Sequence, residues 1–145
     1  MARIKIELPE KFPFTTSIPV RITDINYGDH VGNDTILSLM HEARVQFLKT
    51  HGYKELEFEG LGMIMADVGI EFKNELFYGD IVIASIAVGE ISKVSFDLYY
   101  KFEKQLEGRN VLVAAGKTGM VCYDYDKKKI AVIPQKAIAA LRSSQ

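Results

Sequence analysis

The spacing of apolar residues switches for one stretch from a period of two to a period of three to four, and this switch constrains the fold most. Ile18, Val20 and Ile22 alternate with polar residues, as in a half-buried strand. From Asp34 to about Thr50, apolar residues recur three or four positions apart, which predicts a long amphipathic helix. Asn33 or Asp34 is expected to cap this helix.

After a loop at 53–62, alternation returns and predicts strands at 64–73, 81–88, 93–102 and 111–125, followed by a short helix at 135–141. Short connections make the neighbouring strands antiparallel. The order predicts one two-layer α+β domain spanning residues 1–145, with the helix packed on the sheet. Segment 81–88 is apolar on both faces, and a partner subunit is its simplest cover.

Charge and composition exclude several classes of protein. Lys and Arg total 18 against 19 Asp and Glu, so the net charge of −1 gives no general attraction to nucleic acid. The first ten residues lack the apolar run of a signal peptide, and no segment approaches the ~18 apolar residues of a membrane span. We therefore expect a cytoplasmic protein without nucleic-acid or membrane partners. The single cysteine, Cys122, is expected to be a buried, unreactive thiol.

Two apparent motifs carry no function. Gly116-Lys117-Thr118 resembles the end of a phosphate-binding loop, but position 111 is Val where that motif needs Gly, so a strand with a glycine bulge is predicted. The three histidines, at 30, 41 and 51, lack a metal-binding spacing. We expect neither a metal nor a redox cofactor.

The segment from Asp24 to Asp34 is the best candidate for a functional site. It holds three acids, two amides, a histidine and two glycines directly before the long helix. A titratable imidazole beside carboxylates, at a helix start whose N–H groups stabilise anions, supplies the parts for acyl transfer. Glu42 lies further along the helix, just off its apolar stripe, at a subunit edge or in solvent.

The stretch Arg21-Ile-Thr-Asp-Ile-Asn-Tyr-Gly-Asp-His-Val-Gly-Asn33, followed by His41-Glu-Ala-Arg44, resembles the hotdog-fold acyl-CoA thioesterases of the 4-hydroxybenzoyl-CoA thioesterase group. The segment from Ile70 to Val82 agrees, and the resemblance covers roughly residues 17–136. It implies a long central helix wrapped by a five-stranded antiparallel sheet, and active sites at the interface of a homodimer or dimer of dimers.

The resemblance also implies that Asn26 stands where one branch of the family has a catalytic Asp. An amide is neither nucleophile nor general base, so Asn26 is expected to position water or the carbonyl group. Gly32 and Asn33 are expected to supply oxyanion-hole N–H groups. His30 or Glu42 would be the base, and Asp29 would orient the histidine or balance its charge.

The function expected is hydrolysis of an acyl-CoA or, as a second choice, of an acyl carrier protein thioester. The alternatives are a hotdog hydratase or dehydratase and a non-catalytic acyl-CoA-binding protein. Asn26 is the best argument for the binding protein, because it replaces an acid.

Overall fold

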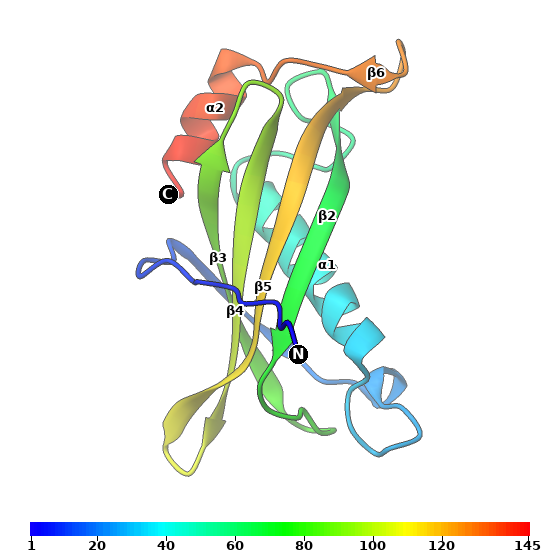
Figure 1. Cartoon of the computed structure of the whole chain (residues 1–145), viewed down its shortest axis with the longest axis vertical. Helices are drawn as coiled ribbons and strands as arrows, with labels where there is room; N and C mark the ends of the chain where they lie inside the picture. The colour runs from blue at the N-terminus through cyan, green and yellow to red at the C-terminus, as the bar shows by residue number, and fades with distance from the viewer.

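A computed structural model describes all residues, 1–145, as one long helix packed against one curved antiparallel sheet (Figure 1). The helices are α1 (Asn33–Thr50) and α2 (Gln135–Arg142), with a 3-10 turn, η1, at Ile22–Asp24. The strands are β1 (Phe14–Pro19), β2 (Gly62–Phe72), β3 (Ile81–Ile91), β4 (Ser95–Leu106), β5 (Arg109–Asp124) and β6 (Lys129–Ile130). The predicted fold is confirmed: the five long strands form the sheet, and the two-residue β6 only extends its margin.

The sheet order is β1-β3-β4-β5-β2, with every neighbouring pair antiparallel. β1 and β2 are consecutive in the chain but form the two opposite edges of the sheet. The segment that contains α1 connects them across one face of the sheet (Figure 1). Buried side chains of α1, among them Met40, Ala43 and Phe47, form the core with alternate residues of β3, β4 and β5. Burying these apolar faces against each other is the main stabilising term of the domain.

The two ends of α1 differ from each other in how they are closed. Gly32 occupies the N-cap position and no side chain caps the helix, so the predicted capping by Asn33 or Asp34 is wrong. A Cβ atom at Gly32 would lie 2.6 Å from Oδ1 of Asp34. Any other residue at position 32 would therefore require the Asp34 side chain to move. At the other end, Gly52 has φ +76° and ends the helix as expected.

Local turn chemistry corrects two sequence predictions. β1 ends at Pro19, and Ile22 is two-thirds exposed in η1, because the Asp24 carboxylate accepts the Arg21 N–H at 2.8 Å and holds a turn there. Gly116 is not a bulge: it pairs in register with both neighbouring strands. A Cβ atom there would lie 2.6 Å from Cε of Met40, so Gly116 makes room for α1.

The N-terminal segment crosses the sheet face that points away from α1. Residues 1–13 cross this face from the β2 side to the β3 side before turning into β1 (Figure 1). The Ile6 N–H donates to the Glu71 carboxylate, and the Phe12 ring lies 4.6 Å from Nζ of Lys101. Both faces of β3 are buried as predicted, with Ala87 only 1% exposed, but within one chain. This burial does not depend on a partner subunit, and the expected dimer stays a prediction.

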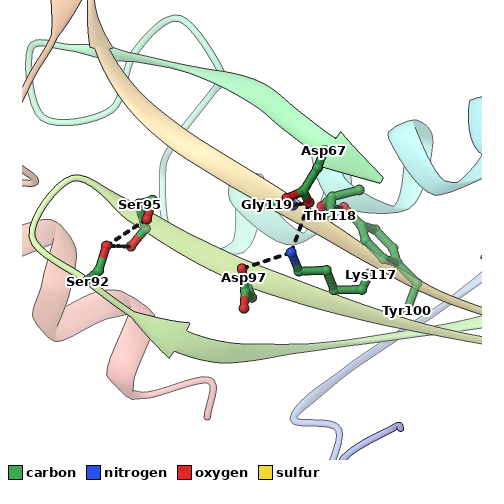
Figure 2. Close-up of polar contacts among 8 residues, drawn as sticks. All are labelled: Asp67, Ser92, Ser95, Asp97, Tyr100, Lys117, Thr118 and Gly119. Carbon is green, nitrogen blue, oxygen red and sulfur yellow. Dashed lines mark hydrogen bonds and ion pairs between the residues drawn. The ribbon is translucent and has the colours of Figure 1, made fainter. Parts of the chain in front are cut away.

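A charged cluster also joins three strands on this outer face. Nζ of Lys117 on β5 lies 2.9 Å from Oδ1 of Asp67 on β2 and 3.4 Å from Oδ1 of Asp97 on β4 (Figure 2). The same Asp67 oxygen accepts the N–H of Gly119 at 2.9 Å, beside a β-bulge in β2. Hydrogen bonding to Lys117 lowers the pKa of Asp67, and the same bond raises the pKa of Lys117.

Inside the core, a polar contact links α1 to the middle of the sheet. Nη1 of Arg44 donates to Oη of Tyr100 at 3.0 Å, and Tyr100 shares a 2.8 Å hydrogen bond with Thr118. All three residues are buried, and burial raises the pKa of the Tyr100 phenol. Elsewhere in the core, the Cys122 thiol is fully buried, and its burial raises its pKa, as predicted for an unreactive cysteine. Neither helix has the length and apolar composition of a bilayer-spanning segment.

Candidate active site

The loop between η1 and α1 is closed by its own backbone. Ile25 and Val31 form a β-bridge, and the Asn26 N–H donates to the carbonyl of His30 at 2.9 Å. Asp29, at φ 64°, takes the left-handed conformation at the tip of the turn. This closure brings Asn26, His30 and Gly32 together at the start of α1.

The imidazole of His30 is held in one tautomer. Its Nδ1 lies 3.0 Å from the carbonyl oxygen of Val31, which can only accept, so Nδ1 carries the proton. Nε2 is then left with its lone pair free. The His30 side chain is 31% exposed. It lines a cleft of about 590 Å³, the larger of two clefts described below. The arrangement suits proton acceptance by Nε2.

Asn33, the first residue of α1, lines the same cleft. No hydrogen bond in the chain uses the N–H of Gly32 or Asn33, and the first helical bond runs from the Ile36 N–H to the Gly32 carbonyl. Unpaired N–H groups at the positive end of an 18-residue helix form a site for a developing negative charge.

Asn26 uses its side-chain oxygen locally. Oδ1 accepts the Gly28 N–H at 2.8 Å, which leaves Nδ2 as the free donor. A Cβ atom placed at Gly32 would lie 3.4 Å from Nδ2, so this donor sits beside the unpaired N–H groups. Asn26 can therefore donate to an oxygen atom held at the helix start.

The cleft has a volume of about 590 Å³ and joins this loop to the turn between β2 and β3. The Val31 N–H donates to the carbonyl of Leu76 at 2.9 Å, which fixes the two segments to each other. Half of the lining side chains are apolar, and the lining also includes Lys73, Glu75 and Lys104. A cleft that combines apolar side chains with polar and charged groups can hold a small organic group and fix its orientation.

The structure separates Glu42 from this group of residues. Glu42 lines a second cleft, of about 440 Å³, with Arg21, Asp24 and His41. Its carboxylate accepts Nε2 of Gln46 at 2.9 Å. Within one chain, only His30 of the two candidate bases lies beside the unpaired N–H groups.

Asp29 does not take the predicted place beside His30. Asp29 is exposed and makes no hydrogen bond to His30, because the left-handed turn separates their side chains. Asp24 is buried and paired with Arg21, in a structural role. The carboxylate that does face His30 is Glu75, 4.0 Å from Nε2, which sequence reasoning missed.

No group of three or more His, Cys, Asp or Glu side chains is arranged to hold a metal ion. The polar groups that line the larger cleft include the imidazole of His30, the side chain of Asn33 and the charged side chains of Lys73, Glu75 and Lys104.

Residues 20–141 match the family model of the thioesterase-like superfamily, while no curated protein sequence matches the chain significantly. A hypothetical protein from Thermus thermophilus has a similar structure, with a TM-score of 0.79, 26% identity, and coverage of 90% of this chain and 98% of that chain. A 1,4-dihydroxy-2-naphthoyl-CoA thioesterase from Synechocystis has a TM-score of 0.79 at 20% identity, with coverage of 89% of this chain and 95% of that chain. A mutant 4-hydroxybenzoyl-CoA thioesterase complexed with 4-hydroxybenzoyl-CoA has a TM-score of 0.80 at 16% identity, with coverage of 87% of this chain and 96% of that chain. The chain therefore belongs to the thioesterase-like superfamily, with the hotdog fold, and is a thioester hydrolase.

Proposed function

We propose that the protein hydrolyses an acyl-CoA thioester to the free acid and CoA by attack of water, using no metal or redox cofactor. The observation that carries this proposal is that Asn33, whose N–H is unpaired, and His30, whose Nε2 is free, line one half-apolar cleft, with Gly32 directly before Asn33. Two structural neighbours are named for CoA thioester substrates, which favours CoA over acyl carrier protein as the thiol carrier.

The thioester carbonyl is placed with its oxygen at the start of α1. The N–H groups of Gly32 and Asn33 donate to this oxygen as it gains negative charge in the tetrahedral intermediate. Nδ2 of Asn26, beside them, donates to the same oxygen or to the attacking water. The acyl group occupies the apolar part of the cleft.

His30 is the general base of the proposed reaction. Nε2 takes a proton from water as the water oxygen bonds to the carbonyl carbon. The intermediate then breaks its C–S bond, and the imidazolium returns the proton to the leaving thiolate. Water is thereby divided between the acid and the thiol, and His30 ends neutral. Glu42 remains the competing candidate, although it lies in the other cleft.

The test is thiol release from a panel of acyl-CoA and acyl carrier protein thioesters. With an imidazole as the base, the rate rises with pH as the imidazolium form, which cannot accept a proton, disappears. His30→Gln should remove this limb, whereas Glu42→Gln should preserve it. The reverse result would assign the base to Glu42, and no thiol release from any substrate would exclude hydrolysis.

The same panel separates the alternatives. A hydratase or dehydratase would change the acyl chain and leave the thioester intact. A binding protein would show saturable affinity for acyl-CoA without turnover, and the replacement of an acid by Asn26 is the observation in its favour.

A further inference from the structure

Glu75 lies in the turn between β2 and β3 and faces His30 across the candidate cleft. Its Oε1 is 4.0 Å from Nε2 of His30, and no other carboxylate lies within ion-pair distance of this imidazole. Nε2 is the ring nitrogen that gains the proton, because Nδ1 already donates to the Val31 carbonyl. Any charge that appears on His30 therefore appears on the side facing Glu75.

Two backbone contacts hold Glu75 in this place. Nζ of Lys104, which is nearly buried, donates to the carbonyl oxygen of Glu75 at 2.7 Å. The next residue, Leu76, accepts the Val31 N–H at 2.9 Å. The sheet and the loop thus fix the backbone of Glu75 beside the loop that carries His30, although the two residues are far apart in the sequence.

The other charges around His30 have partners of their own or make no contact with it. Lys73 pairs with Glu71 at 3.1 Å, and Lys104 pairs with Asp80 at 3.2 Å. Asp29 in the loop and Asp34 in the first turn of α1 are exposed and form no ion pair. Glu75 is the carboxylate best placed to respond to the charge of the imidazole.

We infer that Glu75 is a positioning residue for the hydrolysis, acting through His30 by stabilising its imidazolium form. The inference rests on the proposed function, in which Nε2 takes a proton from water and later returns it to the thiolate. Glu75 favours the charged imidazole between these two transfers and does not bond to the substrate. The side chains are 31% and 61% exposed, so solvent screens the pair and its effect is modest.

The kinetic test compares Glu75→Gln with Glu90→Gln, a matched control for an exposed acid on β3 that makes no ion pair. Glu75→Gln should lower kcat about 2- to 5-fold, leave KM unchanged and move the rising limb of the pH profile down by about half a pH unit. Glu75→Asp, which keeps the charge, should restore most of this limb. The difference from the parent should vanish near ~1 M salt, where the screening length falls to about 3 Å.

A titration of His30 by nuclear magnetic resonance, without substrate, gives a second readout, and His30→Gln identifies its signal. Glu75→Gln should move the midpoint to lower pH, and Glu90→Gln should leave it in place. A parental midpoint and pH profile in Glu75→Gln would overturn the inference even in an active enzyme. Absence of turnover with every thioester would overturn the proposed function, and the positioning role of Glu75 in hydrolysis with it.

Discussion

The two polar atoms of the Asn26 side chain have different surroundings. Oδ1 holds the turn through the Gly28 N–H, and Nδ2 is free beside the start of α1. Asn26→Ala should lower kcat roughly 10²-fold, the scale expected when one positioned donor is lost, with little change in KM. Steady-state kinetics would measure this, with Tyr27→Ala as control, because the neighbouring Tyr27 is fully exposed. Parental kcat in Asn26→Ala would remove Asn26 from the mechanism.

The phenol of Tyr53 has a raised pKa. Burial, aided by its 2.6 Å hydrogen bond to the Glu59 carboxylate, raises the pKa of Tyr53 to about 12. Because this pKa is higher in the folded chain than in the unfolded chain, the resulting stability is present below about pH 10 and is lost as pH rises through about 12. Denaturant unfolding from about pH 9 to 12 should show this decline, and Tyr53→Phe should reduce it. Equal pH dependence in both proteins would contradict the assignment.

At the scale of elements, the Asp67–Lys117–Asp97 cluster ties β2, β5 and β4 together (Figure 2). Since Asp67 is largely exposed, Asp67→Asn should cost less than about 1 kcal/mol at neutral pH. The pKa of Asp67 is lower in the folded chain than its ordinary value. The ion pair therefore stabilises the fold at pH values above the ordinary pKa of an Asp, and this stabilisation is lost as the pH falls through the lowered pKa. A double-mutant cycle with Lys117→Met should give a coupling energy that disappears in acid. Coupling that persists there would rule out a charge interaction.

The elements could be predicted wherever one periodicity extended over several turns or pairs. α1 and β4 follow this rule, since their buried side chains recur regularly. The prediction failed where a local contact outweighed the pattern, as where Asp24 ends the alternation after Pro19. It failed at Gly116 because the cause is a distant side chain, Met40.

The candidate site was predictable only in its local part. Asn26, His30, Gly32 and Asn33 share one loop and one helix start, so their proximity follows from the sequence. Glu75 approaches His30 only because the sheet order places the β2–β3 turn beside that loop. No spacing in the sequence encodes that contact.

At the scale of the whole molecule, β2 is an edge strand that leaves one side of its backbone unpaired. Met65, Val68 and Phe72 are each about 40 to 50% exposed along it. An open edge of this length favours pairing with another strand. We therefore predict a homodimer joined through β2, with twice the 16.3 kDa mass of one chain by sedimentation equilibrium.

Val68→Lys should dissociate this dimer, because a charge on the edge opposes strand pairing. Val132→Lys is the matched control, since Val132 is exposed away from β2. A stable monomer of the parent chain would contradict the prediction. A tetramer that dissociates on deletion of residues 1–13 would show that the N-terminal segment joins dimers as well as crossing the sheet.

The complete burial of Cys122 makes the chain a convenient reporter of its own unfolding. A reagent that detects free thiols meets none on the folded protein, so CoA released by hydrolysis can be followed without background from the enzyme. When the core opens, that same thiol becomes reactive. The rate of its modification then reports how often the core between α1 and the sheet exposes its interior, in the parent and in each variant, without any added label.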